Sequence, residues 1–428
     1  MILTDTALAK RMQANNPVRV AMVGAGYMSQ CIALQIIQAT PGMRLVAISN
    51  RTPSKAEQVY RDAGVVETVR ASSAAALEDA IGKNKYVVTD DPSILWNAGS
   101  VEAIIEVTGD PEFGSRVAYE SLRQGKHVIM LNAEVDASVG PILKTYADRA
   151  GVVYSYTDGD EPGVMMNLFR LVESMGCQPM LVGQLKGMLD RYRTPATQKE
   201  FAEKFNVNAA IVASFADGSK LNLESAIMGN ATGFAPAKRG MHGHPCAHVK
   251  DLMAKFSLED FKQGGLVEYV LGAEPHTGAF VMAYNEHPIR GKLLGYLKMG
   301  QGPFYMFYTP YHLPPMQLPH SVARAVLFND PTITPKGAPT CDTIAYAKRD
   351  LKAGERLDGM GGYTNYGLVD KYEVCRRGNF LPMAVSLDCV MKRDMPKDQP
   401  ITYADVDLPR DRIVDKLRAE QLARFPVA

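Results

Sequence analysis

A glycine-rich turn directly follows the first apolar stretch of the chain. Val18–Val23 predicts a buried strand, and Gly24-Ala25-Gly26 predicts a tight turn that opens into a helix and then a second strand. This order of elements is typical of a dinucleotide-binding unit. The turn lets backbone N–H groups approach a pyrophosphate at a helix N-terminus, where the helix dipole favours anions. We expect the cofactor to contact Gly24, Ala25, Gly26, Tyr27 and Met28.

The residues after the second strand indicate which dinucleotide binds. Sites that prefer NADH usually place Asp or Glu here, to accept hydrogen bonds from the ribose hydroxyls. This chain instead has Asn50, Arg51 and Thr52, followed by Ser54 and Lys55. Such side chains favour a 2′-phosphate through charge-assisted hydrogen bonds. We therefore predict NADPH, with a solvated basic turn as the alternative.

Cationic side chains gather in the segment LKGMLDRYR. It contains Lys186, Arg191 and Arg193, with Asp190 between them. Ammonium and guanidinium groups in such a segment are suited to hold a phosphate. We predict that it binds a phosphorylated substrate, and a solvated basic turn is again the alternative.

Carboxylates gather in the turn DGDEPG. Asp158 and Asp160, with Glu161 beside them, offer the oxygen ligands that Mg²⁺ or Mn²⁺ takes, usually together with substrate oxygens and water. Acidic residues are also frequent in turns that bind no metal. Two interpretations stay open, a divalent-ion site at Asp158 and Asp160 or an ordinary turn.

The segment HGHPCAH contains residue types that bind zinc, namely His242, His244, Cys246 and His248. In an extended strand these four side chains share a face but span ~20 Å, at ~3.3 Å per residue. One ion with ligands at ~2.1–2.3 Å cannot take all four. A pair such as His242 and His244 joined by a distant carboxylate is one alternative, and hydrogen bonding to a substrate is the other.

Tyr311 and His312 directly follow a predicted aromatic strand, Phe304–Tyr308. The charge of a histidine changes near neutral pH, which suits a general acid. We predict that Tyr311 or His312 faces the substrate, and that Lys186 or His312 supplies a proton.

The elements that position these residues alternate between strand and helix up to residue 157. Strands are predicted at Val101–Val107, His127–Leu131 and Val152–Tyr156, with helices near Ser115–Gln124 and Pro141–Ala150. Near-continuous apolar strands separated by helices predict an α/β fold with a Rossmann-type, doubly wound parallel sheet. Ligands of such a sheet lie at the carboxyl ends of its strands. This adds Thr108, Gly109 and Asn132 to the expected cofactor site.

The remaining chain predicts two further regions. Residues 158–316 mix helices with strands such as Gly265–Leu271 and Ala279–Tyr284, which predicts an α+β substrate domain. Pro319–Phe328, within a return segment at 317–337, predicts a helix that packs on the first domain. Residues 338–428 contain a weak repeat, KRDL followed by KAGE and KRDM followed by PKDQ, which predicts a small, mostly-β module.

Composition excludes several classes of protein. The 428 residues carry a formal net charge of +1, so no overall field favours nucleic acid or membrane. No apolar run is long enough to cross a bilayer, and the N-terminus has no apolar signal-peptide core. The six cysteines form no C-x-x-C pair. We expect a cytoplasmic protein with reduced thiols.

Several long strings resemble a known family: IIEVTGDPEFG, GKHVIMLNAEVD, YSYTDGDEPG, RYRTPATQ, FADGSK, GPFYMFYTPYHL and AKRDLKAGERLDGMGGYTNYG. They are similar to bacterial oxidoreductases that are often labelled homoserine dehydrogenases and carry a C-terminal SAF-type domain. Within that family the chain most resembles the 1-deoxy-D-xylulose 5-phosphate reductoisomerase-like branch. The resemblance implies a homodimer whose subunits have a nucleotide-binding domain at 1–157, a catalytic domain at 158–316 and a SAF-like domain at 338–428.

That branch makes 2-C-methyl-D-erythritol 4-phosphate with NADPH, a step of isoprenoid biosynthesis by the MEP pathway. Homoserine dehydrogenases end the strand equivalent to His127–Leu131 in Asn-Lys, and glucose–fructose-type oxidoreductases have Glu-Lys-Pro there. This chain has Asn132-Ala133-Glu134 and lacks that lysine. The resemblance implies an NADPH-dependent reductoisomerase of a sugar phosphate. An NADP-dependent oxidoreductase of a small hydroxy or oxo substrate, or a non-catalytic NADPH-binding sensor, are the alternatives.

Overall fold

The computed structural model describes residues 3–427, which form two compact units. Unit 1 contains the residues up to Gly159, Leu313–Thr334 and Arg412–Gln421. Unit 2 contains Asp160–His312, Pro335–Asp411 and the residues from Leu422 on. The segment from residue 338, which we expect to be a separate module, lies in unit 2 apart from Arg412–Gln421.

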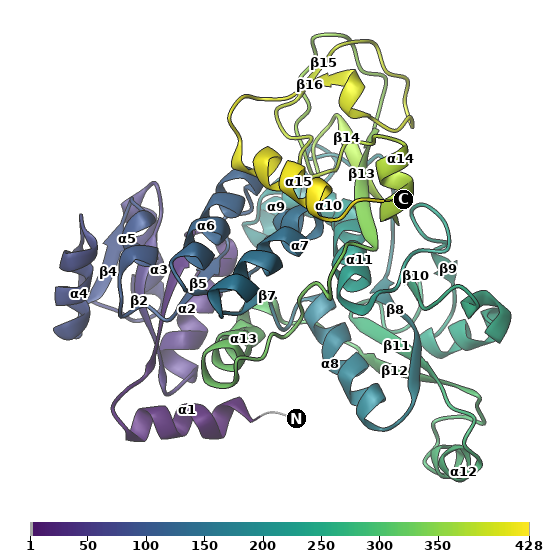
Figure 1. The fold of residues 1–428 in the computed structure, drawn as a ribbon, viewed down its shortest axis with the longest axis horizontal. Coiled ribbons are helices and arrows are strands. Elements are labelled where there is room, and N and C mark those ends of the chain that lie inside the picture. Colours follow the sequence, from purple (N-terminus) through teal and green to yellow (C-terminus); the bar gives the residue numbers. More distant parts are fainter. Residues whose placement is uncertain (1–2, 428) are drawn as a thin grey trace. The chain divides into compact units, whose positions relative to one another are not determined.

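Unit 1 is built on a seven-stranded sheet of order β3-β4-β2-β1-β5-β6-β7, in which every pairing is parallel. This sheet confirms the predicted Rossmann-type fold class (Figure 1). Its two short strands β3 and β4 were not predicted from the sequence. The strands are β1 Val18–Val23, β2 Met43–Ser49, β3 Thr68–Arg70, β4 Tyr86–Thr89, β5 Ala103–Glu106, β6 His127–Met130 and β7 Tyr154–Tyr156.

Helices cover both faces of this sheet because alternate residues of a strand point to opposite sides. Val20 and Met22 of β1 join a core with helices α2, α3 and α13, whereas Ala21 and Val23 join a second core with α4 and α6. The helices of unit 1 are α1 Thr4–Gln13, α2 Tyr27–Ala39, α3 Pro53–Asp62, α4 Ala74–Gly82, α5 Ser93–Asn97, α6 Pro111–Arg123, α7 Ala133–Ala150, α13 Pro314–Phe328 and most of α15 Ile413–Arg424.

Two of these helices begin earlier than the sequence predicts. Pro141 and Pro319, which we expect near helix starts, lie inside α7 and α13. Proline favours a first helical turn, but inside a helix it removes only one backbone hydrogen bond. The apolar residues on both sides keep the helix packed, as Leu318 and Val322 of α13 do against Ile32.

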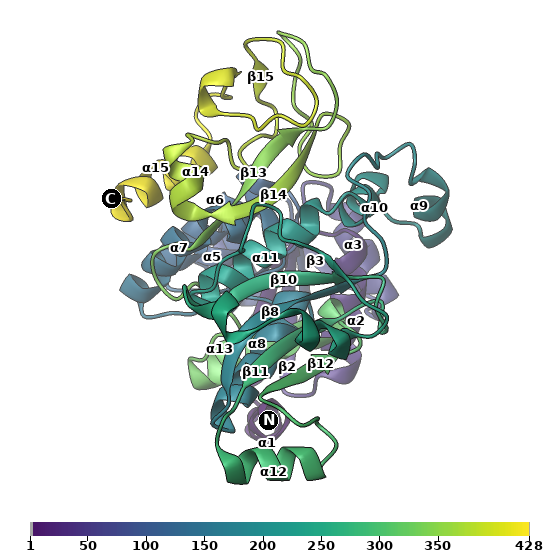
Figure 2. The ribbon, with the colours of Figure 1, turned by 90° about the vertical axis from the view of Figure 1, so that its right-hand side faces the viewer.

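Unit 2 contains a five-stranded mixed sheet of order β12-β11-β8-β10-β9 (Figure 2). Its strands are β8 Gln178–Lys186, β9 His244–Pro245, β10 Leu266–Leu271, β11 Ala279–Tyr284 and β12 Phe304–Thr309. The helices of residues 160–312 are α8 Glu161–Ser174, α9 Lys199–Phe205, α10 Ala209–Ala216, α11 Ser219–Thr232 and α12 Pro288–Tyr296, with 3₁₀ turns at Val249–Lys255 and Leu258–Phe261.

The sequence did not predict the central strand β8 or helix α8. β8 is a central strand that pairs with β10 on one side and with β11 on the other. Only Gln178 of this strand is exposed, so its sequence lacks the alternation of apolar and polar residues that marks a half-exposed strand. The turn DGDEPG continues into α8 at Glu161, with Pro162 in the first turn. Proline in a first turn leaves a helix intact, because that position needs no N–H donor.

The C-terminal part of unit 2 is a pair of strands with a short helix and small bridges. β13 Cys341–Ala347 pairs antiparallel with β14 Asn365–Lys371, and α14 Tyr372–Arg377 follows. β15 Val390–Met391 pairs with β16 Val406–Asp407, after a 3₁₀ turn at Tyr403–Asp405. The two copies of the weak repeat contact each other, through a bridge between Leu351 and Met395 and an ion pair of 2.7 Å between Lys352 and Asp394.

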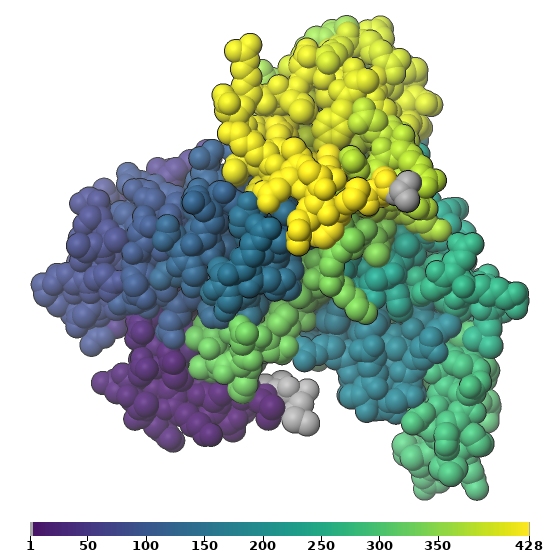
Figure 3. All heavy atoms as spheres, in the orientation of Figure 1, coloured from purple at the N-terminus to yellow at the C-terminus, as the bar shows by residue number. Residues whose placement is uncertain are grey.

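Helix α12 is the most exposed helix of unit 2 described here. None of its residues is buried, and Figure 3 shows it projecting at the lower right. Among the described helices of the chain, none combines the length and apolar character that crossing a bilayer requires.

Candidate active site

The glycine turn of unit 1 has the geometry that a dinucleotide site needs. Gly24 has a φ of +117°, and a Cβ on it would lie 2.9 Å from the carbonyl oxygen of Val107. Gly26 precedes α2, and its N–H donates to Ser29 Oγ at 3.1 Å. Ser29, the small third residue of the motif, is buried and holds the turn through this hydrogen bond. The structure thus presents a helix N-terminus behind β1, where a pyrophosphate is favoured.

The residues that follow β2 are held in place while their cationic side chains face solvent. The Asn50 amide donates to the Thr52 carbonyl at 2.9 Å, and Thr52 precedes α3. Arg51, Thr52 and Lys55 are exposed. Within residues 3–427, no hydrogen bond or ion pair engages the Arg51 guanidinium. A free guanidinium at a helix N-terminus is suited to a phosphate.

A buried carboxyl group that the sequence analysis missed lies beneath Thr108. Glu106 ends β5, and its Oε1 accepts hydrogen bonds from the Thr108 backbone N–H at 2.8 Å and from the Thr108 hydroxyl. Burial raises the pKa of Glu106 to about 7. Gly114 makes room for this group, because a Cβ there would lie 3.1 Å from Glu106 Oε2 and 2.9 Å from the Asn132 amide nitrogen. Thr108 and Asn132, both expected at the cofactor site, thus lie beside one buried acid.

Unit 2 contains a network of lysines and carboxylates at the start of α8. Lys186, from the end of β8, pairs with Glu161 at 3.0 Å. Lys220 of α11 lies 3.2 Å from both oxygens of Asp160 and also pairs with Glu224. His312 Nε2 lies 3.6 Å from Glu161 Oε2. Residues from four separate elements of unit 2 therefore meet at one place.

This lysine–carboxylate network holds acids in opposite protonation states. Burial opposes ionisation of Glu161, but Lys186, Lys220 and His312 hold its pKa well below the usual value. Burial and the charge of Glu161 instead raise the pKa of Glu224 to about 8. Lys220 stays charged, since its carboxylate neighbours outweigh its burial and raise its pKa. A protonated acid and an ionised acid on either side of an ammonium group are the components of a proton-transfer site.

Two oxygens of the network, Glu161 Oε2 and Glu224 Oε2, are buried and accept no hydrogen bond from the described residues. Glu161 Oε2 meets His312 and Lys220 only at the longer ion-pair distances of 3.6 and 3.8 Å. Buried polar atoms in native proteins are usually satisfied by protein, water or a ligand. These two oxygens are therefore candidate contacts for the hydroxyl groups of a bound substrate.

Asp160, Glu161 and His312 also form a candidate metal group, with one ligand atom of each within 4.8 Å of the others. Asp160 belongs to this group as expected, whereas Asp158 does not and instead lies in unit 1. The donor types suit Mg²⁺ or Mn²⁺. Lys186 and Lys220 nevertheless compete for the same oxygens, so an ion would have to displace ammonium groups that already balance the carboxylates.

The structure separates the residues that were expected to bind phosphate together. Lys186 belongs to the network, but Arg193 pairs with Asp190 at 3.1 Å, and the Arg191 guanidinium lies 5.9 Å from the ring centre of Tyr366. The described contacts place neither guanidinium in the network. Tyr311 is exposed, unlike its neighbour His312, whose Nδ1 lies 3.0 Å from the Thr277 hydroxyl. The reason is that consecutive residues after a strand can face different ways.

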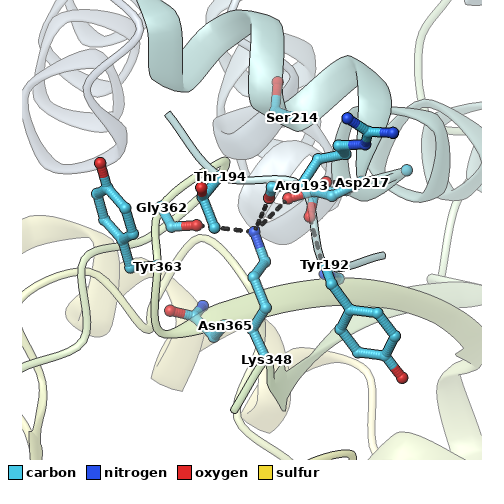
Figure 4. Close-up of polar contacts among 12 residues, drawn as sticks. Tyr192, Arg193, Thr194, Ser214, Asp217, Lys348, Gly362, Tyr363 and Asn365 are labelled. Atoms are coloured by element: carbon cyan, nitrogen blue, oxygen red, sulfur yellow. Dashed lines mark hydrogen bonds and ion pairs between the residues drawn. The ribbon is translucent and has the colours of Figure 1, made fainter. Parts of the chain in front are cut away.

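A second buried lysine anchors the segment that carries these arginines (Figure 4). Lys348 Nζ lies 2.8 Å from the Arg193 carbonyl, 2.8 Å from Asp217 Oδ2 and 2.7 Å from the Gly362 carbonyl. Its side chain is 2% exposed. Burial raises the pKa of Asp217, although the Lys348 charge opposes that rise. This lysine fixes the backbone at Arg193 and leaves the arginine side chain outside.

Lys220, Glu224 and Glu106 were not predicted as site residues. Lys220 and Glu224 are four residues apart in FADGSKLNLE, a spacing that also describes an ordinary surface ion pair on a helix. Their burial could not be read from α11, because almost all of that helix is buried and no polar face marks it. Glu106 had one signal, a lone acid within the apolar strand AIIE.

Two family models match parts of the sequence. Residues 18–130 match an oxidoreductase family with an NAD-binding Rossmann fold, and residues 159–318 match the catalytic domain of oxidoreductase DRL. The second match contains the whole lysine–carboxylate network. A comparison with curated proteins finds no match.

Solved structures are similar to parts of the chain at low identity. A probable dehydrogenase from Thermotoga maritima is 13% identical, with a TM-score of 0.38, over 63% of this chain and 73% of that one. A scyllo-inositol dehydrogenase from Lactobacillus casei with bound NAD(H) and scyllo-inositol is 14% identical, with a TM-score of 0.36, over 63% and 74%. A 3-ketoreductase from Actinomadura kijaniata in complex with TDP-benzene and NADP is 16% identical, with a TM-score of 0.37, over 73% and 90%.

Proposed function

We propose that the chain is an NADPH-dependent reductoisomerase of a sugar phosphate. The proposal is supported by the matches of residues 18–130 to an oxidoreductase family with an NAD-binding Rossmann fold and of residues 159–318 to the catalytic domain of oxidoreductase DRL. The proposed reaction converts 1-deoxy-D-xylulose 5-phosphate and NADPH, with one proton, into 2-C-methyl-D-erythritol 4-phosphate and NADP⁺. The observation that carries the proposal is the buried lysine–carboxylate network within the catalytic domain.

The network fits the demands of the rearrangement. A hydroxy ketone rearranges by losing a hydroxyl proton while negative charge develops on neighbouring oxygens, and no electrons are exchanged. The ammonium groups of Lys186 and Lys220 stabilise such oxyanions, because they are fixed charges in a buried site. Glu161 is ionised beside these cations, while Glu224 holds a proton that it can donate. The buried oxygens of both acids that accept no hydrogen bond within the chain are suited to accept one from substrate hydroxyls.

The reduction requires a hydride from NADPH and a proton. In the proposed mechanism His312 gives that proton to the oxygen of the aldehyde as the hydride reaches its carbon. Thr277 orients the imidazole through Nδ1, which leaves Nε2 directed at Glu161. We keep Mg²⁺ or Mn²⁺ as a prediction: an ion held by Asp160 and Glu161 would polarise the vicinal oxygens of the substrate and leave His312 free to give its proton.

The free Arg51 guanidinium supports NADPH as the reductant. Replacing Arg51 with Ala is expected to raise KM for NADPH about tenfold, because a charge-assisted hydrogen bond contributes about 1.5 kcal/mol. KM for NADH should stay unchanged. Steady-state kinetics with both cofactors measures this. A wild-type preference for NADH would contradict the assignment.

The decisive test is NADPH oxidation with 1-deoxy-D-xylulose 5-phosphate, with and without a chelator, and identification of the product by NMR. Faster turnover of a non-phosphorylated hydroxy or oxo compound would instead indicate a simple dehydrogenase. Tight NADPH binding without turnover would indicate a sensor.

The homodimer is a further part of the proposal. Helix α12 offers an exposed apolar surface that a second copy of the chain would cover, formed by Ile289, Leu293 and Tyr296. Light scattering on Leu293→Asp and on the wild-type protein tests it, with dissociation expected only in the variant.

A further inference from the structure

A second cluster of metal-binding side chains lies at the edge strand of the unit 2 sheet. His242 precedes β9, His244 begins it, and Glu268 lies on the neighbouring strand β10. One ligand atom from each residue lies within 4.8 Å of the other two. None of the three belongs to the lysine–carboxylate network. The tertiary structure thus identifies Glu268 as a distant carboxylate beside the histidine pair, which the sequence could not name.

Glu268 is a preformed anionic ligand. Its side chain is 3% exposed. It accepts hydrogen bonds from the backbone N–H groups of His242 at 2.8 Å, Gly243 at 2.9 Å and Tyr269 at 2.9 Å. These donors fix the orientation of the carboxylate.

Both histidines direct a ring nitrogen at the same oxygen of that carboxylate. His242 Nδ1 lies 3.0 Å from Glu268 Oε2, and His244 Nε2 lies 3.9 Å from it. The two rings stack with centroids 5.2 Å apart. Two ligands of a tetrahedral ion, each bound at ~2.0–2.1 Å, are ~3.3 Å apart. The two nitrogens thus lie on either side of that spacing in their distance from Glu268 Oε2, at 3.0 and 3.9 Å.

The His244 nitrogen lacks any other partner. Among the residues that the structure describes, Nε2 of His244 is buried and makes no hydrogen bond. An unsatisfied buried nitrogen costs free energy that a bound ion would remove.

We propose that His242, His244 and Glu268 bind one divalent transition-metal ion of the zinc class, with water as the fourth ligand. Two imidazoles and one carboxylate suit Zn²⁺, whereas Mg²⁺ prefers oxygen ligands alone. Cys246 is not a ligand, because its side chain packs against the hydrophobic core of unit 2. The ion would tie the segment before β9 to β10.

Zinc titration of the full-length, tag-free chain, stripped with a chelator, tests this proposal. Calorimetry is expected to give about one tight Zn²⁺ per chain, and Co²⁺ is expected to give the absorption spectrum of a tetrahedral site. His242→Ala and His244→Ala should each lower the affinity for Zn²⁺ at least ~100-fold. This is more than the loss of a residue that only hydrogen-bonds to a ligand would cause. Both variants keep Glu268 and its backbone bonds, so circular dichroism should show an unchanged fold. The exposed His287→Ala is the control and should bind as the wild type does.

His312→Ala distinguishes this site from the proposed active site. It should retain the tight zinc, because His312 is not one of the three ligands. Loss of zinc in His312→Ala but not in His244→Ala would overturn the proposal and assign the ion to the Asp160 group. Absence of tight zinc from the wild-type chain would overturn it as well. The readout is metal binding, so failure of the reductoisomerase assay leaves the result unaffected.

Discussion

Two lysines of unit 2, the buried Lys348 and the half-buried Lys220, differ in how completely the acids around them are satisfied. Lys348 donates to three oxygens at 2.7–2.8 Å, one of them the carboxylate of Asp217. Lys220 instead faces Asp160, Glu161 and Glu224, and two of those acids keep a buried oxygen that accepts no hydrogen bond from the described residues.

This difference separates a structural ion pair from a reactive one. A lysine with one carboxylate and two carbonyls has its charge and its three N–H donors matched, so nothing is left for a ligand. A lysine among three acids shares protons with them, and small changes in its surroundings shift their protonation. The charge and all N–H donors of Lys348 are matched, which indicates a structural role. Two acids around Lys220 keep an oxygen without a hydrogen bond, which indicates a role in chemistry.

Removing the Lys220 charge should give the largest effect on activity. Lys220→Met is expected to lower kcat about 10³-fold, or about 4 kcal/mol, because the oxyanion of the transition state loses a fixed positive charge. Steady-state assays of the purified variant measure this. Lys199→Met is the matched control, since Lys199 pairs with Glu203 at the same helical spacing on the surface. Equal kcat values for Lys220→Met and the control would remove Lys220 from the site.

Removing the Lys348 charge should instead lower stability. Lys348→Met is expected to cost about 3–5 kcal/mol in the free energy of unfolding, because Asp217 is left buried and unpaired. Urea denaturation measures this, and Lys348→Met combined with Asp217→Asn should recover part of the loss. Lys352→Met, which breaks an exposed pair with Asp394, should change little. An unchanged midpoint for Lys348→Met would contradict the structural role.

The arginines on the segment that Lys348 anchors test whether that segment meets the substrate. Arg191→Ala and Arg193→Ala are each expected to raise KM for the sugar phosphate about 10–100-fold and to leave stability near the wild-type value. Arg356→Ala, which removes an exposed pair with Asp388, is the control. If KM stays constant in both variants, the phosphate binds elsewhere.

The raised pKa of Glu224 predicts a smaller effect, on pH dependence. Glu224 donates a proton below its pKa of about 8 and cannot do so above it, so kcat should fall at alkaline pH. Glu224→Gln should remove that alkaline limb of the rate profile. In the folded state Glu224 keeps its proton to a higher pH than in the unfolded chain, whose pKa is ~4.3, so its contribution to stability declines as pH rises from ~4 to ~8. A pH profile identical in wild type and variant would exclude Glu224 as the donor.

The amino-acid sequence alone determined the strand, glycine turn and helix that begin unit 1. These elements are adjacent in the chain, so periodicity and turn chemistry locate Gly24 and Gly26 directly. In unit 2, Lys186 and His312 were singled out by residue type, but Lys220 and Glu224, which contact the same carboxylates, were not.

Only the tertiary structure decided which side chains meet. Asp160, Lys186, Lys220 and His312 come from elements spread over more than half of unit 2, and their contacts depend on how α8, α11, β8 and β12 pack. In the same way, two histidines are visible in the sequence, but Glu268 reaches them only through the pairing of β9 with β10. Local patterns report local geometry, whereas contacts between distant residues depend on packing that no short segment encodes.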